Sequence, residues 1–172
     1  FLLKTFTSKY ERSKLMGAEN IFVHLVENYY EDESYTPWLD SAQRQRILKR
    51  GRQLSPITIG KKAPDLIMLD INNRPRSLHN VQADFTILCF WAFDCGHCKK
   101  VLPKLRAYYD EVKDKGVEVF AVSTKQELEG WKKFVEDKEL KGWINVHDQG
   151  GRNRIHDVYD IYSTPVIYLL DK

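Results

Sequence analysis

The sequence predicts an α/β fold with a mixed, mainly parallel sheet and helices on both faces, preceded by a helical N-terminal segment. From Ile59 onward, short apolar runs alternate with amphipathic stretches, and such strand–helix–strand alternation is typical of a parallel sheet. Before that point, apolar residues recur at helical spacing instead. We therefore expect a helical segment over residues 1–55 and an α/β domain over residues 56–172.

The composition is that of a folded protein and does not indicate nucleic acid or membrane as the main partner. Hydrophobic residues make up 42% and charged residues 30% of the 172 residues, and the net charge is only +3. No apolar stretch approaches the ~18–20 residues of a membrane helix. The opening Phe1-Leu2-Leu3 is too short for a signal peptide. The chain stops directly after an apolar run, so we expect the full protein to be longer.

The N-terminal segment should contain two amphipathic helices joined by a turn. Asn20 is the expected cap of the first helix and Ser41 of the second, which should run through Leu54. Tyr35-Thr36-Pro37-Trp38 predicts the turn, with aromatic residues as anchors. The apolar residues at helical spacing are Ile21, Phe22, Leu25, Val26 and Tyr29 in the first helix, and Ile47 and Leu48 in the second.

Basic residues are densest in the second of these helices, at Arg44, Arg46, Lys49, Arg50 and Arg52. A run of like charge is usually a solvated helix face. Phosphate binding is the alternative, but nucleic-acid grooves combine basic with aromatic side chains, and no aromatic residue interleaves here. We therefore interpret the run as a solvent-facing surface.

The α/β part is predicted to contain six strands and three helices. A continuous apolar run over Phe85–Ala92 is typical of a strand buried on both faces. Gly116 should end the helix that follows that strand. The other expected strands cover residues 66–70, 76–78, 117–123, 144–146 and 165–170, and the expected helices cover 96–115, 126–139 and 152–159.

Cys95 and Cys98 lie three residues apart where the buried strand gives way to a helix. Positions i and i+3 share a helix face, so the two sulfurs can reach disulfide distance. Cys95 falls at the helix N-terminus, where free backbone N–H groups and the helix dipole stabilise a thiolate, the nucleophilic form. A protonated His97 should lower the pKa of Cys95 further. The placement indicates a redox-active pair.

Other interpretations of the pair fit less well. A structural zinc site needs four ligands, whereas this chain offers one CxxC and scattered histidines. An inert buried pair has no need of a helix start, and a copper carrier usually spaces its cysteines as CxxxC. We therefore expect no metal and no cofactor beyond a Cys95–Cys98 disulfide.

Four motifs, in this order along the chain, resemble the thioredoxin-like TlpA/ResA family. They are Gly60-Lys61-Lys62-Ala63-Pro64-Asp65, Phe90–Lys100, Gly116–Ser123 and Ser163-Thr164-Pro165. The resemblance covers residues 59–172 and implies a thioredoxin-like fold, with one more strand and helix after Lys172. The preceding segment is similar to helical extensions of Bacteroidetes thioredoxin-like proteins. The family implies an extracytoplasmic location, in the periplasm or cell envelope. Some members are attached to the membrane by a lipid anchor, and the full-length protein could carry one.

The resemblance also implies roles for residues near the cysteines. Pro165 matches the cis-proline of the family, which would hold the backbone of Thr164 beside the sulfurs. Trp91, Thr164 and Pro165 would then contact the substrate. CGHC is the site sequence seen in protein disulfide isomerases.

Three positions depart from the family pattern. Cys89 replaces a buried acid, and a buried thiol is a poor proton acceptor at neutral pH. Asp94 replaces a tryptophan, and its carboxylate should oppose the Cys95 thiolate by roughly 1 kcal/mol in water. Val101 replaces a glutamate common in cytochrome-maturation members, which puts an apocytochrome substrate in doubt.

The expected function is thiol–disulfide oxidoreduction on protein substrates, in which Cys95 attacks, a mixed disulfide forms and Cys98 resolves it. The direction of electron flow would depend on a membrane or soluble redox partner that recharges the site. The alternative is a non-catalytic protein that holds a partner through its helical segment. A peroxidase fits less well, because the PxxxTxxC arrangement of peroxiredoxins is missing around Cys95.

Overall fold

The computed structural model describes residues 2–13 and 15–172, and the chain divides into two compact units. The first unit runs to Pro64 and also includes Asp157–Asp160, a short segment from the C-terminal part of the chain. The second unit comprises Asp65–His156 and Ile161–Lys172. The second unit therefore contains all three cysteines and the strands of the described residues.

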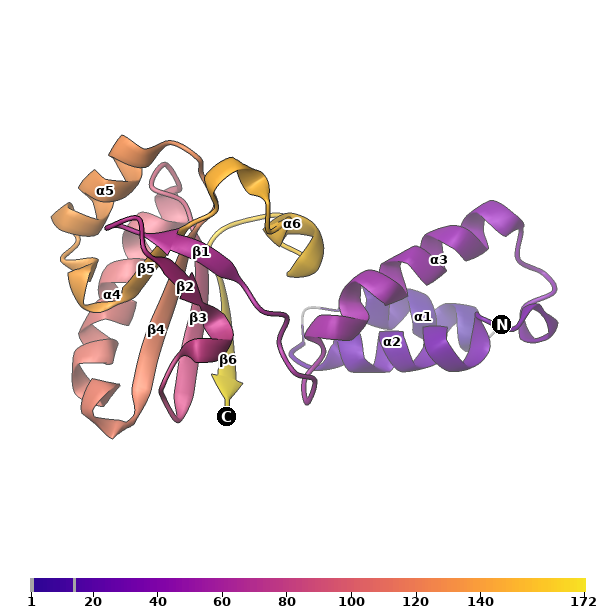
Figure 1. The fold of residues 1–172 in the computed structure, drawn as a ribbon. Coiled ribbons are helices and arrows are strands. Elements are labelled where there is room, and N and C mark those ends of the chain that lie inside the picture. Colours follow the sequence, from indigo (N-terminus) through magenta and orange to yellow (C-terminus); the bar gives the residue numbers. More distant parts are fainter. Residues whose placement is uncertain (1, 14) are drawn as a thin grey trace. The chain divides into compact units, whose positions relative to one another are not determined.

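Three α-helices make up most of the described part of the first unit (Figure 1). They are α1 (Leu2–Glu11), α2 (Ala18–Tyr29) and α3 (Ser41–Leu54). Gly51 allows α2 and α3 to approach closely, because a Cβ atom there would lie 2.6 Å from Cγ1 of Val26. The buried side chains of this small core are Phe22, Val23, Val26, Tyr30, Ile47, Leu48 and Leu54. Ile47 and Leu48 thus face inward as predicted, whereas Ile21 and Tyr29 are exposed.

The predicted caps of both helices are wrong. Gly17 precedes α2 with a φ of 82°, a conformation that favours glycine. Asn20 lies inside the helix, where its side chain exchanges hydrogen bonds with the backbone of Ile59 at 3.0 and 3.1 Å. Asp40 caps α3 in place of Ser41, and its carboxylate accepts a backbone N–H of the first turn at 2.8 Å. A carboxylate at this end also suits the helix dipole.

The basic run on α3 is not uniformly solvated, which corrects the sequence interpretation. Arg44 is only 5% exposed, and its guanidinium donates to the carbonyl oxygens of Tyr30 at 2.8 Å and Thr36 at 3.3 Å. A buried charge needs such partners, so Arg44 holds the connection between α2 and α3 in place. The aromatic residues of that connection are not anchors, because Tyr35 and Trp38 are exposed.

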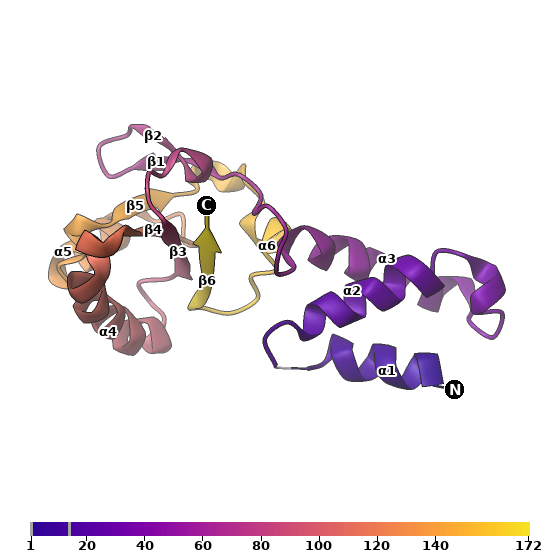
Figure 2. The ribbon, with the colours of Figure 1, turned by 90° about the horizontal axis from the view of Figure 1, so that it is seen from below.

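The second unit is built on a six-stranded mixed sheet with the strand order β2-β1-β5-β4-β3-β6 (Figures 1 and 2). The strands are β1 (Ile67–Asp70), β2 (Pro75–Ser77), β3 (Phe85–Trp91), β4 (Val117–Ser123), β5 (Ile144–His147) and β6 (Val166–Asp171). The β3–β4 and β4–β5 pairs are parallel, and the β1–β2, β1–β5 and β3–β6 pairs are antiparallel. The α/β class and the mixed sheet are confirmed, but the sheet is not mainly parallel, because three of its five strand pairs are antiparallel and the parallel pairs lie at its centre.

Two long helices cover one face of this sheet, α4 (Gly96–Val112) and α5 (Leu128–Asp137), as both ribbon views show. A short α6 (Ile155–Val158) precedes β6. The core between the sheet and the two long helices includes Trp91, Trp131, Cys89 and Cys98. Helix α4 ends at Val112, three residues earlier than predicted, and Gly116 ends the 3₁₀ helix that follows, Lys113–Lys115, with a φ of 78°. No helix in the described residues is long and apolar enough to cross a membrane.

Candidate active site

Three separate segments meet at one edge of the sheet. Trp91 at the end of β3 pairs with Ser123 at the end of β4, so the chain leaves both parallel strands at the same edge. Since β6 runs antiparallel to β3, with Val166 opposite Phe90, it starts at this edge too. The cysteines after β3 and the segment before β6 are therefore brought together, although 69 residues separate Cys95 from Thr164.

Cys95 is the N-cap of α4, as the sequence predicted. Its backbone is extended, and its Sγ accepts a hydrogen bond from the N–H of Cys98 at 3.3 Å. The Cys95 thiol also donates to the carbonyl oxygen of Thr164 at 3.2 Å. Cys95 is partly exposed and Cys98 is fully buried, and both are free thiols in this structure. A substrate can thus reach the first sulfur but not the second.

The two thiols have pKa values shifted in opposite directions. Burial raises the pKa of Cys95, but hydrogen bonds with the side chains of Thr164 and Cys98 and from the backbone N–H groups of Cys98 and His97 outweigh it and lower the pKa to about 7. Burial raises the pKa of Cys98 to about 11, and the neighbouring Cys95 adds to the rise. Near neutral pH, therefore, Cys95 supplies the thiolate and Cys98 stays a thiol.

The segment before β6 lies beside the two cysteines. The Thr164–Pro165 peptide bond is cis, as the resemblance implied. Both residues are partly exposed, so a bound substrate could contact them beside Cys95. Trp91 differs from this expectation, because its side chain is fully buried and packs on Phe134 at 4.8 Å between ring centroids. We therefore do not count Trp91 among the residues that could touch a substrate.

Lys125 is a component of this edge that sequence reasoning missed. Its Nζ lies 2.8 Å from the Asp94 carboxylate, and this hydrogen bond lowers the pKa of Asp94. The negative charge expected to oppose the Cys95 thiolate is thus paired with a cation. Lys125 lies two residues after the end of β4, and Asp94 lies three residues after the end of β3. Parallel pairing of β3 and β4 places these two positions at the same edge, so a prediction of that pairing could have identified Lys125.

Cys89 lies beneath the site, at the position where thioredoxins have a buried acid. It is fully buried, and burial, followed by the nearby Cys98, raises its pKa to about 12. A thiol with that pKa accepts no proton at neutral pH. This agrees with the interpretation of Cys89 as a small core residue.

His97 donates its backbone N–H to the Cys95 sulfur, which lowers the pKa of Cys95, and we expect its side chain to lower that pKa further. Replacing His97 with proline removes both groups, because proline has no N–H. We expect the pKa of Cys95 to rise and the couple to become more reducing, by about 30 mV for each pKa unit. His97→Asn keeps the N–H and measures the side-chain effect separately. Glutathione redox titrations provide the potentials, and a His97→Pro potential equal to that of the parent would contradict this account.

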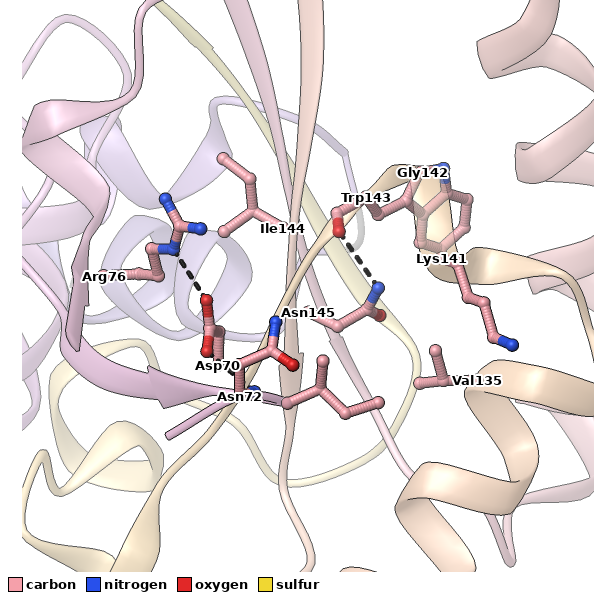
Figure 3. A pocket seen from close by; sticks show the side chains of 10 residues that line it. Asp70, Asn72, Arg76, Val135, Lys141, Gly142, Trp143, Ile144 and Asn145 are labelled. Atoms are coloured by element: carbon pink, nitrogen blue, oxygen red, sulfur yellow. Dashed lines mark hydrogen bonds and ion pairs between the residues drawn. The ribbon is translucent and has the colours of Figure 1, made fainter. Parts of the chain in front are cut away.

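A cavity of about 330 Å³ lies elsewhere in the second unit (Figure 3). Arg76 donates to Asp70 at 2.9 Å on one side of it, and the Asn145 amide donates to the carbonyl of Trp143 at 3.1 Å on the other. The cavity adjoins the start of β5, whereas the cysteines follow the end of β3, so it is not part of the cysteine site. Among the described residues, no three His, Cys, Asp or Glu side chains form a group that could hold a metal ion.

A CxxC pair that begins a helix after a central parallel strand, next to a cis-proline, defines a thioredoxin-like protein. The pair, the helix and the cis bond are all present here. Residues 59–172 match the AhpC/TSA family, and the chain belongs to this family.

Similar proteins agree on the class. The thiol-disulfide oxidoreductase ResA of Bacillus thuringiensis subsp. konkukian is 31% identical over 114 residues, which are 66% of this chain and 64% of that protein. The chain thus spans less than two thirds of this curated relative. A domain of a possible thiol-disulfide isomerase from Cytophaga hutchinsonii is 44% identical, with a TM-score of 0.63 over 66% of this chain and 77% of that one.

One similar structure also includes the N-terminal helices. A thioredoxin-like protein from Bacteroides caccae has a TM-score of 0.73, and the match covers 99% of this chain and 69% of that one. Its sequence identity is 20%, so the likeness concerns the fold. A helical segment followed by a thioredoxin-like domain therefore occurs in another protein.

Proposed function

We propose that this protein is a thiol–disulfide oxidoreductase that acts on protein disulfides through Cys95 and Cys98. The observation that carries the proposal is the asymmetry of the two thiols. Cys95 is accessible with a pKa lowered to about 7, and Cys98 is buried with a pKa raised to about 11. The names of the ResA and Cytophaga hutchinsonii relatives support the same chemistry.

In the reductive direction, the Cys95 thiolate attacks one sulfur of a substrate disulfide. A bond between Cys95 and that sulfur forms, the substrate S–S bond breaks, and the released substrate thiolate takes a proton. Cys98 then loses its proton and attacks the Cys95 sulfur, which forms the Cys95–Cys98 disulfide and releases the second substrate thiol. Two electrons pass from the dithiol to the substrate. Oxidation of a substrate is the same sequence in reverse.

The partners and location follow from this chemistry and from the family resemblance. Protein disulfides persist in oxidising compartments, so we place the protein outside the cytoplasm, in the periplasm or cell envelope. A membrane or soluble redox partner would restore the site after each turnover. Thr164 and Pro165, which are partly exposed, would receive an extended substrate segment beside Cys95.

Insulin reduction tests the proposal directly. With dithiothreitol as the electron source, the protein should accelerate precipitation of the insulin B chain well above the rate with dithiothreitol alone. Cys95→Ser should remove the acceleration, because the accessible thiolate is lost. A parent protein no faster than dithiothreitol alone would favour the non-catalytic alternative.

A further inference from the structure

Helix α4 begins with basic rather than acidic residues. Lys99, Lys100 and Lys104 lie in its first three turns, and Asp110 and Glu111 lie near its end. Acidic side chains stabilise the N-terminal end of a helix and basic side chains its C-terminal end. Yet α4 has no acidic residue in its first turn, although its C-cap residue Lys113 supplies a cation at the favourable end. Helix stability therefore does not explain the lysines near the start of α4.

The three lysines, which we call the lysine ridge, begin one residue after Cys98. All three are exposed. In the part of the chain that the structure describes, the side-chain ion pairs of α4 belong to other residues, since Arg106 and Lys113 both pair with Asp110. The ridge is thus a group of exposed cations on the helix that Cys95 caps.

Asp94 does not cancel this positive charge. Its carboxylate pairs with Lys125 at 2.8 Å, and the pKa of Asp94 is lowered by that hydrogen bond, with a smaller effect from Lys99. Lys125 already supplies the cation that Asp94 needs. The lysine ridge is therefore not neutralised by Asp94, and its positive charge favours contact with negatively charged groups.

The distance along α4 from Cys95 to the last lysine of the ridge limits where negative groups would lie in a bound substrate. Lys104 follows Cys95 by nine residues, and a helix rises by about 13 Å over that length. An extended peptide spans the same distance in about four residues. We propose that the lysine ridge selects substrate disulfides with acidic residues within about four positions of the attacked cysteine. This inference rests on the proposed function and specifies its substrate class.

Three synthetic peptide disulfides test the inference, identical except for aspartate, asparagine or lysine at the positions flanking the cysteine. Their rates of reduction by the reduced protein are measured at low and high salt, and each is divided by its rate with dithiothreitol to remove intrinsic differences in reactivity. At about 20 mM salt the aspartate peptide should react about 10-fold faster than the asparagine peptide, and the lysine peptide more slowly. At about 300 mM salt the differences should shrink, because ions screen exposed charges.

Charge reversal on the ridge provides the second arm of the test. Lys100→Glu/Lys104→Glu should make the lysine peptide react faster than the aspartate peptide. The matched control Lys132→Glu/Lys133→Glu makes the same charge change on exposed positions of α5 and should keep the parent order. Failure to reduce even the asparagine peptide would overturn the proposed function. Reduction of all three peptides at one rate, or the same behaviour of both double variants, would overturn only the substrate preference.

Discussion

A Cys98→Ser variant should accumulate as a covalent adduct with substrate proteins, and its turnover should fall by more than about 100-fold. Cys95 keeps its capping position and its hydrogen bond from the backbone N–H of residue 98, so it can still attack. No thiol then remains in place to break the mixed disulfide. Non-reducing gels and mass spectrometry of the adducts measure the trapping.

Two further cysteine variants test whether the trapping depends on Cys95 alone. Cys95→Ser should trap almost no substrate, because the remaining thiols, Cys89 and Cys98, are fully buried. Adding Cys89→Ser to Cys98→Ser should leave the trapping unchanged. If Cys95→Ser and Cys98→Ser trapped substrate equally, the attacking role of Cys95 would be misassigned.

Iodoacetamide should alkylate Cys95 more than about 100-fold faster than Cys98 in the reduced protein at pH 7. The thiolate is the reacting form, and the pKa is lowered to about 7 at Cys95 and raised to about 11 at Cys98. As pH rises, the Cys95 rate should climb through about pH 7 and then level off, since deprotonation is complete above its pKa. Burial of Cys98 slows its alkylation further.

Mass spectrometry of the alkylated peptides, sampled over time at several pH values, measures both rates. Unfolding the protein in denaturant is the control, because it removes burial and the hydrogen bonds together and should bring the cysteines to similar rates. First labelling of Cys98 in the folded protein would contradict the proposed division of roles.

Local sequence patterns were sufficient for the strands and for the position of the reactive thiol. The six strands were each predicted to within one residue at either end, because apolar runs and turn residues act over short distances. Cys95 was placed at a helix N-terminus for the same reason, since a strand end, a CxxC spacing and a helical pattern are consecutive in the chain. The two helix caps failed, because Asn20 and Ser41 were judged without the neighbours that compete for the role.

Features that depend on distant contacts were decided by the tertiary structure. Arg44 is buried and donates hydrogen bonds to carbonyl groups at the end of α2 and in the connection to α3. The pattern of charges along the sequence does not reveal this burial. Trp91 is enclosed by α5, so the role implied by resemblance does not apply to its side chain. The pairing of Asp94 with Lys125 likewise required knowledge of which strands are neighbours.

The sequence by itself thus determined the fold class, the strands and the reactive pair, because these follow from periodicity and from residues close together in the chain. The tertiary structure decided the environment of the pair. Strand pairing in the sheet carries Thr164 to Cys95 across 69 residues and leaves Cys98 buried. Hydrogen bonding and burial then separate the two pKa values, since both depend on atoms that only the folded chain brings together.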